Sequence, residues 1–231
     1  MKVEIWSDVV CPFCYIGKRK FEKALEGFEA KDKVAIEWRS FQLDPDMEYV
    51  AGQSVHEYLS KRKGTSAVEG KRMNDAMTAM AKEVGLEYNF DKAIVNNTFN
   101  AHRLLHFAKE KGLQNEMKER LFRAYYTEGK NVGDIDTLAL LGEEVGLQAE
   151  EIRTVLQSEK YAQDVLLDQY KAQQIGANGV PFYVFNNKYA VSGAQPSEVF
   201  AQVLEKVWEE EKPVLITEQG EGFCTVDGVC N

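Results

Sequence analysis

The chain has 231 residues, of which 44% are hydrophobic, and its formal net charge is −9 at pH 7. A chain of this size can bury one full core and a sizeable subdomain. Its acidic balance argues against a nucleic-acid partner, which would require clustered Lys and Arg. No apolar run approaches the ~20 residues that span a bilayer, and the N-terminus lacks the features of a signal peptide. We therefore expect no membrane partner and a cytoplasmic location.

The chain begins with a predicted strand and a predicted helix. Val3 and Ile5 alternate with charged residues, which is typical of a half-buried strand. Phe21 and Phe28 then recur at helical spacing. The run Cys11-Pro12-Phe13-Cys14 lies at the junction between the two elements.

This junction gives the two cysteines a chemical role. Pro12 fits the first helical position, so Cys11 immediately precedes the helix and Cys14 lies one turn on. Free N–H groups and the helix dipole favour a thiolate, so we expect a lowered pKa and a nucleophilic role for Cys11. Cys14, less exposed, is placed to attack the resulting mixed disulfide. Two thiols at this spacing also suit a zinc half-site, an interpretation that we rank below redox chemistry.

A second strand follows the first helix. Val34, Ile36 and Trp38 share one face of this strand, and Ala35 and Phe41 lie on the other. Apolar residues on both faces predict a central strand that is covered on two sides, in parallel with the first strand.

The middle of the chain is predicted to be helical. Apolar residues recur at helical spacing, and three helix ends share a Gly-Leu pair at Gly85, Gly112 and Gly146. Each pair fits a left-handed glycine just past the helix, with the leucine folding back on the last turn. The stripe Met73, Met77 and Met80 is more typical of a core than of a substrate groove.

The C-terminal part returns to strands. A helix over about 161–174 precedes predicted strands at 180–185 and 189–191, joined by a turn at 186–188. A last helix is predicted to begin at Pro196 and to end before Pro213.

Several of these stretches resemble a known family. The run 7–17, the helical middle and Gly179-Val180-Pro181-Phe182 are similar to the DsbA-like branch of the thioredoxin superfamily that is related to FrnE. The resemblance covers nearly the whole chain and implies an α/β thioredoxin fold with a large helical insertion. The predicted parts are a thioredoxin-fold domain (1–45 and 160–213), a helical insertion (46–159) and a C-terminal tail (214–231) with a second cysteine pair.

The resemblance also assigns supporting residues. It implies a cis bond between Val180 and Pro181 and a loop that faces the cysteine pair and binds the substrate backbone. DsbA has histidine where this chain has Phe13, so we expect a reduction potential between the ~−120 mV of DsbA and the ~−270 mV of thioredoxin. Members of the superfamily use a buried carboxylate as proton acceptor, and Glu37 and Asp8 are the candidates. An ordinary solvated charge is an equally good interpretation of either residue.

Three further residues are candidates for a substrate groove. The segment 97–103 resembles one that FrnE-like proteins share with kappa-class glutathione transferases and 2-hydroxychromene-2-carboxylate isomerases, which points to Asn97 and His102. Asn97 also fits a helix cap. His102 and His106 have the spacing of a metal half-site without a third ligand, so ordinary histidines are the stronger interpretation. Gln195 belongs to a loop that resembles the family's active-site neighbour, and a plain turn fits it equally well.

The tail carries Cys224 and Cys230, which a three-residue loop over 226–228 would place opposite each other. A disulfide is feasible there, either as a structural staple or as a relay that exchanges with Cys11 and Cys14.

These patterns favour a thiol–disulfide oxidoreductase or disulfide isomerase. We expect it to act on protein thiols and disulfides or on small thiols such as glutathione, as a monomer or homodimer. We expect no metal and no organic cofactor. The alternatives are a glutathione-dependent transferase or isomerase and a redox sensor or four-cysteine metal protein. Relatives of the transferase type place serine where Cys11 stands, which weighs against the first alternative.

Overall fold

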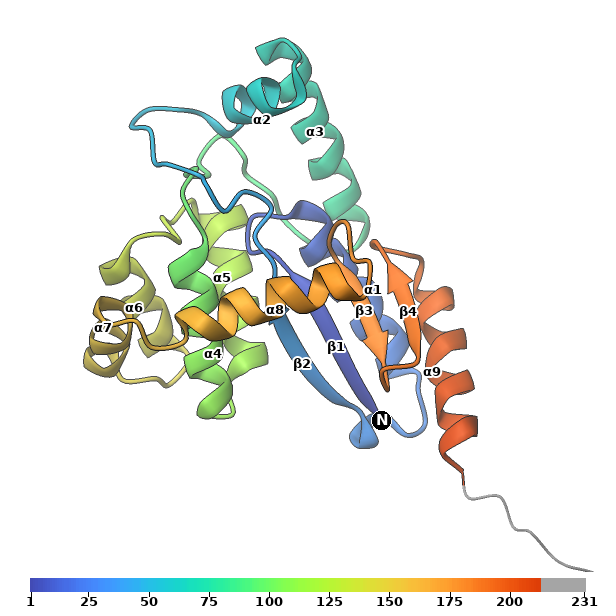
Figure 1. Ribbon diagram of the computed structural model, residues 1–231. Coiled ribbons are helices and arrows are strands. Elements are labelled where there is room, and N and C mark those ends of the chain that lie inside the picture. The colour runs from blue at the N-terminus through green and yellow to red at the C-terminus, as the bar shows by residue number, and fades with distance from the viewer. Residues whose placement is uncertain (213–231) are drawn as a thin grey trace, which may run out of the picture.

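The computed structural model describes residues 1–212. The strands of this part form one sheet: β1 (Lys2–Ser7), β2 (Ala35–Ser40), β3 (Phe182–Phe185) and β4 (Tyr189–Ser192). Their order across the sheet is β2-β1-β3-β4 (Figure 1). β1 pairs in parallel with β2 and antiparallel with β3, and β3 pairs antiparallel with β4. The predicted parallel crossover and the return of two C-terminal strands are confirmed.

Helices cover the sheet on both faces. The covering helices are α1 (Pro12–Glu26), α8 (Ala162–Gln174) and α9 (Ser197–Glu211). Because side chains alternate along a strand, Ile5 of β1 lies in one core with Phe21 of α1 and Phe200 of α9. Trp6, the next residue, lies in the opposite core with Ala172 of α8.

The position of β2 in the sheet differs from the prediction that it is a central strand. β2 is an edge strand, because periodicity reports which faces are apolar but not which strands are neighbours. Side chains nevertheless bind its free edge. The Gln114 amide accepts from the Trp38 N–H at 3.0 Å and donates to the Trp38 carbonyl at 2.9 Å, and Asp168 accepts from the Ser40 N–H at 3.0 Å. These bonds satisfy backbone groups that an open edge would expose.

The helices between β2 and α8 end as predicted. They are α2 (Val55–Lys63), α3 (Ala67–Glu83), α4 (Phe99–Glu110), α5 (Gln114–Arg123), the π-helical turn η2 (Ala124–Glu128), α6 (Ile135–Glu144) and α7 (Ala149–Gln157). Gly85, Gly112 and Gly146 are left-handed, with φ of 75°, 74° and 96°. The amide of the leucine after each glycine donates to the carbonyl five residues earlier, at 2.8 to 3.0 Å, which is the expected helix-ending motif. The division of the chain at 46–159 stays a prediction.

The C-terminal strands and helix also follow the prediction. Asn186 and Asn187 have φ of 48° and 55°, as the tight turn between β3 and β4 requires. Pro196 caps α9, whose buried residues are Phe200, Leu204 and Val207.

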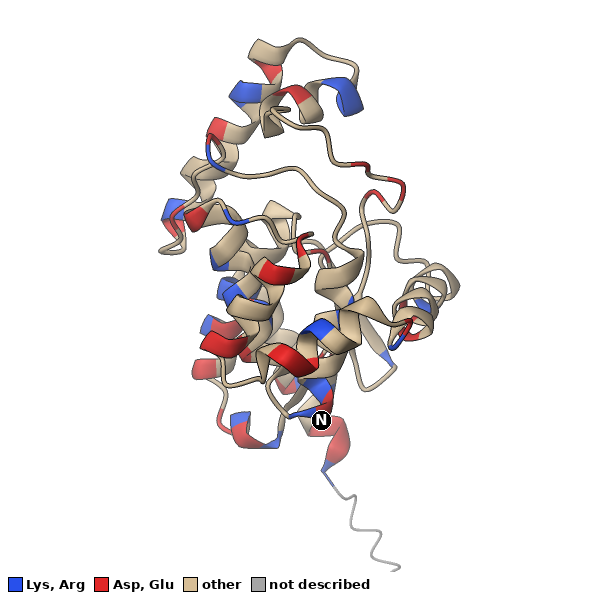
Figure 2. Cartoon of the chain, turned by 90° about the vertical axis from the view of Figure 1, so that its left-hand side faces the viewer, with Lys and Arg blue, Asp and Glu red and all other residues tan. Residues whose placement is uncertain are grey.

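Charges of both signs are distributed over the molecule. In Figure 2, the Lys and Arg positions, in blue, alternate along the ribbon with the Asp and Glu positions, in red. Within residues 1–212, no helix has the length and apolar character needed to cross a membrane.

Candidate active site

The cysteine pair lies where β1 passes into α1. Cys11 is the N-cap of α1 and is 3% exposed, and Pro12 opens the helix. Cys14, in the first turn, is 0% exposed, and both cysteines are free thiols. Phe13 between them is 39% exposed and is one of the residues that line a cavity next to the pair. The predicted placement of the motif, with Cys14 the less exposed cysteine, is confirmed.

A proline loop lies against the pair. The Val180–Pro181 bond is cis, as expected, and the Cys11 thiol donates to the Val180 carbonyl at 3.4 Å. Gly17 of α1 permits this close approach. A Cβ atom at Gly17 would lie 2.6 Å from Tyr183 Oη and 3.1 Å from Pro181 Cγ, so the glycine lets α1 pack directly against the loop.

The prediction of a lowered pKa for Cys11 is wrong for the reduced pair. The Cys14 sulfur and burial raise the pKa of the Cys11 thiol well above its ordinary value, and the charge of Asp8 adds to the increase. The backbone N–H of Cys14 acts in the opposite direction but does not outweigh them. Reduced Cys11 is therefore a thiol at neutral pH, and the pair needs a group that accepts a proton.

Asp8 is the candidate acceptor that lies at the site. It is 1% exposed and accepts from the Leu43 N–H at 2.7 Å, and its carboxylate pairs with His102 Nε2 at 3.2 Å. Burial alone would raise the pKa of Asp8, but the bonds from His102 and Leu43 lower it overall. Burial lowers the pKa of His102. Asp8 is therefore held as a carboxylate, which is a weak proton acceptor near neutral pH.

Lys118 of α5 is a buried group that sequence reasoning missed. Its side chain is 0% exposed, and its ammonium donates to the Ser7 carbonyl at 3.4 Å, at the end of β1. Burial lowers its pKa to about 8, against the opposing effects of Cys14, Asp8 and Cys11. The sequence did contain a signal for its burial, because Lys118 lies three residues before Leu121 and therefore on the same buried face of α5.

A cavity of about 540 Å³ opens beside the cysteine pair. Cys11 and Val180 are among its lining residues, together with mostly apolar side chains of α2, α3 and the neighbouring loops. Its size is in the range of small-molecule sites in proteins. Met73 and Met77 line this cavity, and Met77 and Met80 pack against the helical core. The interpretation of the methionine stripe as core therefore holds for Met77 and Met80 but not for Met73.

Residues 2–205 match the family described as the DSBA-like thioredoxin domain. The chain belongs to the DsbA-like thioredoxin-domain family. It is 32% identical over 209 residues to the protein YwbO of Bacillus subtilis (strain 168), covering 87% of this chain and 94% of YwbO. It is 40% identical to a probable DsbA oxidoreductase from Streptomyces coelicolor, with a TM-score of 0.86 over 100% of this chain and 98% of that one.

A more distant structure shares the DsbA-like fold. The cytosolic disulfide reductase DsbM from Pseudomonas aeruginosa, solved with GSH, has a TM-score of 0.63 at 17% identity, over 90% of this chain and 100% of that one. At this identity the likeness concerns the fold alone.

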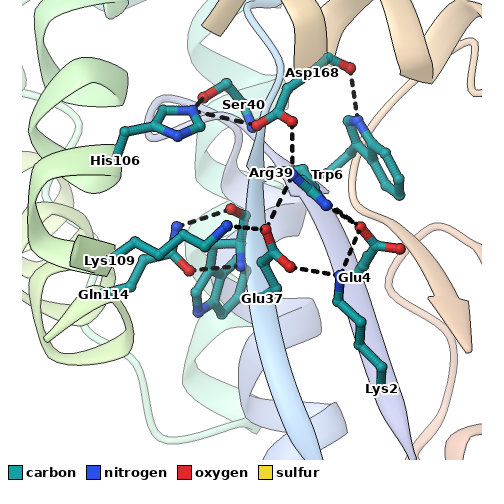
Figure 3. A network of polar contacts seen from close by, with 11 residues as sticks. Lys2, Glu4, Trp6, Glu37, Arg39, Ser40, His106, Lys109, Gln114 and Asp168 are labelled. Carbon is teal, nitrogen blue, oxygen red and sulfur yellow. Dashed lines mark hydrogen bonds and ion pairs between the residues drawn. The ribbon is translucent and has the colours of Figure 1, made fainter. Parts of the chain in front are cut away.

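Glu37, the other candidate acceptor, is not at the site of this DsbA-like chain. It pairs with Lys2 at 2.7 Å, with Arg39 at 3.0 Å and with Lys109 (Figure 3). Burial raises its pKa, but the Lys109 and Lys2 bonds outweigh burial and lower the pKa to about 2. Glu37 also pairs with the middle of β1, whereas the cysteine pair follows the end of β1. The prediction of a catalytic Glu37 is therefore wrong.

The candidate groove residues do not line the cavity. The side chain of Asn97 accepts from the Phe99 N–H at 2.8 Å, as a helix cap would, and donates to the Pro45 carbonyl at 2.8 Å. His102 is 0% exposed and bound to Asp8. Gln195 is exposed and donates to its own turn, at Ser192, at 2.8 Å. The structure thus agrees with the alternatives that the sequence also allowed, which are a helix cap for Asn97, a plain turn for Gln195 and an ordinary buried histidine for His102. Resemblance over a short segment does not report where a side chain points.

The histidines behave as ordinary buried residues. His106 bonds Ser40 Oγ at 3.0 Å and lies 3.3 Å from Asp168, away from the Asp8 partner of His102. No group of three His, Cys, Asp or Glu side chains in the described part of the chain could hold a metal ion. The pair Cys224 and Cys230 lies outside the described residues.

Proposed function

We propose that this DsbA-like protein catalyses thiol–disulfide exchange through Cys11 and Cys14. The observation that carries the proposal is the placement of Cys11, which is the N-cap residue of α1 and lines the cavity, with its thiol 3.4 Å from the Val180 carbonyl. A sulfur that enters the cavity meets Cys11 before it meets the fully buried Cys14. This order suits a nucleophile and a resolving cysteine.

The reaction proceeds in two balanced steps. Cys11 loses its proton as its sulfur attacks one sulfur of a substrate disulfide. A Cys11–substrate bond forms, the S–S bond of the substrate breaks, and the other substrate sulfur leaves with the bonding electron pair and takes up a proton. The Cys14 thiolate then attacks Cys11 Sγ, which forms the Cys11–Cys14 disulfide and releases the second substrate sulfur. The substrate is reduced and the enzyme oxidised. The same steps in reverse oxidise a substrate dithiol.

Phe13 and the proline loop tune this exchange. The carbonyl of Val180 accepts from the Cys11 thiol. Once Cys11 has lost its proton to form a mixed disulfide, this carbonyl can pair with the backbone of the bound substrate. Phe13 supplies neither charge nor a hydrogen bond to a Cys11 thiolate, so the pair is a weaker oxidant than DsbA. This supports reductase or isomerase activity.

The cavity supports a substrate that places an apolar group beside the reacting sulfur. Its lining includes Val10, Leu59 and Phe90, and it is large enough for a small disulfide or for side chains of an unfolded protein. Protein disulfides and glutathione-type disulfides are thus the proposed substrates.

Reduction of insulin by a thiol and refolding of scrambled ribonuclease test the proposal. We expect the wild-type protein to accelerate both and the Cys11→Ser variant to lose this activity. Cys14→Ser should accumulate a mixed disulfide at Cys11. Full activity of Cys11→Ser would refute the mechanism.

A glutathione-dependent transferase or isomerase is the second candidate. The cavity favours it, because its lining is mostly apolar and an apolar second substrate would fit beside a thiol bound near Cys11. Conjugation of glutathione to chlorodinitrobenzene that survives in Cys14→Ser would favour this candidate over disulfide exchange, which requires the second thiol.

The second cysteine pair is proposed as a relay, on the spacing of Cys224 and Cys230 in the sequence. Under oxidising conditions, Cys14→Ser should then form a cross-link between Cys11 and a tail cysteine. Absence of this cross-link, with full activity of the Cys224→Ser/Cys230→Ser variant, would favour a purely structural role.

A further inference from the structure

The least partnered charge near the cysteine pair is the ammonium of Lys118. An ammonium has three donors, and among residues 1–212 this one makes a single, long bond, to the Ser7 carbonyl at 3.4 Å. Aromatic rings surround the rest of it, with Trp38 at 5.5 Å and Phe122 at 4.8 Å from Nζ. Within the described chain it has no carboxylate at ion-pair distance.

Lys18, another buried lysine of this fold, has its charge paired with carboxylates. It is 3% exposed, but its ammonium pairs with Glu22 and, at 2.7 Å, with Glu119. Lys118 is more deeply buried and lacks such a pair. Burying a charge without a partner is costly, so the position of Lys118 calls for a reason other than stability.

The residues that pack around Lys118 also contact the helical turn that carries Cys14. Lys118 and Phe122 are one turn apart on α5, and the Phe122 ring stacks at 4.7 Å on Tyr15, the residue after Cys14. The Ser7 hydroxyl is buried and makes no hydrogen bond within residues 1–212. A polar group able to pass a proton therefore lies on the residue that Lys118 already touches.

We propose that Lys118 is the group that takes up the proton of Cys14 during exchange, a role that rests on the proposed function. In the mixed-disulfide state, the Cys14 thiol gives its proton to the neutral Lys118 amine. The Cys14 thiolate attacks Cys11 Sγ, and the substrate sulfur leaves with the bonding electron pair. Lys118 becomes an ammonium and returns the proton when Cys14 next becomes a thiol.

The charges that face Lys118 make both protonation states accessible. Burial lowers its pKa to about 8, Cys14, Asp8 and Cys11 act against burial, and Lys18 acts with it. His102 lies nearby but is bound to Asp8, and burial lowers its pKa. A group with a pKa close to the working pH can both accept and return a proton.

The reference protein for the kinetic test is the Cys224→Ser/Cys230→Ser chain, and every other variant in this test carries the same two changes, so that only Cys11 and Cys14 react. Release of thionitrobenzoate from its disulfide then separates the two steps. The first equivalent reports attack by Cys11, and the second reports attack by Cys14. In Lys118→Met the second phase should slow about 100-fold, as for loss of a general base, and its pH midpoint should move up from about 8. The first phase should change far less. Lys20→Met is the matched control, because Lys20 also bonds one backbone carbonyl, that of Ala194 at 3.1 Å, and both phases should be unchanged.

The outcomes distinguish this inference from the proposed function. If the Cys224→Ser/Cys230→Ser reference shows no release, or Cys11→Ser in the same background keeps the first phase, disulfide exchange itself fails. If the reference shows both phases and folded Lys118→Met in the same background matches its second phase and pH midpoint, the role of Lys118 is refuted.

A second measurement does not depend on the variant folding. The Lys118 Cε resonance in wild-type protein labelled with carbon-13 lysine should titrate near pH 8, at different midpoints in the reduced and oxidised forms. Identical midpoints in the two forms, or titration near the ordinary value of 10.5, would overturn the proposal.

Discussion

Replacing Arg39 by Met should destabilise the protein through the charge network of Figure 3. The Arg39 guanidinium bonds Glu4 at 2.8 Å and lies 3.0 Å from Glu37 and 3.1 Å from Asp168. Glu4 is 7% and Asp168 2% exposed, so the variant leaves carboxylates with little access to water. Breaking a buried pair costs about 3–5 kcal/mol, and the 13% exposure of the Arg39 side chain argues for the lower end. A loss of about 3 kcal/mol corresponds to roughly 6–12 °C in Tm at this chain length.

The pH dependence of that loss has a definite sign. The pKa of Glu37 is lowered to about 2, so its contribution to wild-type stability is present above its ordinary pKa of 4.5 and is lost as the pH falls toward 2. Without Arg39 the carboxylates repel one another and take up protons more readily. The difference between wild type and Arg39→Met should therefore shrink from pH 7 to pH 4.

Urea unfolding at several pH values measures both effects. The control is Lys71→Met, which removes an exposed pair with Asp75 at 2.8 Å and should leave the free energy of unfolding nearly unchanged, because water screens such a pair. A loss below about 1 kcal/mol in Arg39→Met at pH 7, or one that does not change with pH, would contradict the reasoning.

Three further changes test the active site. Gly17→Ala should lower the free energy of unfolding by about 1–3 kcal/mol through the clash with the proline loop, whereas Gly27→Ala, whose added Cβ would have its nearest neighbour at 3.8 Å, should not. Asp8→Asn should lower the pKa of Cys11, because the Asp8 charge raises it; the pH midpoint of Cys11 alkylation reports this, and an upward shift would contradict it. Phe13→His should raise the reduction potential by roughly 30 mV against a glutathione buffer, and an unchanged potential would show that this position does not tune the pair.

The elements and the cysteine pair were predictable because their signals are local. Alternation, helical spacing and Gly-Leu helix ends depend on residues within a few positions, and the Pro12 position fixed Cys11 at a helix start. The edge position of β2 and the network around Glu37 depend on residues distant in the chain, which periodicity does not report. Lys118 was missed because a lysine on a helix is ordinarily taken as a solvent-facing residue.

The bonds between Gln114 and Trp38 have a mechanical consequence. Gln114 begins α5, and its amide fills the place that a further strand would take beside β2. Swinging α5 away would leave two backbone groups without partners, at about 1–3 kcal/mol each. The position of α5 beside β2 is thus anchored. The cavity beside the cysteine pair is lined instead by residues of α2 and α3, where Met73 and Met77 supply flexible side chains that can adapt to differently shaped substrates.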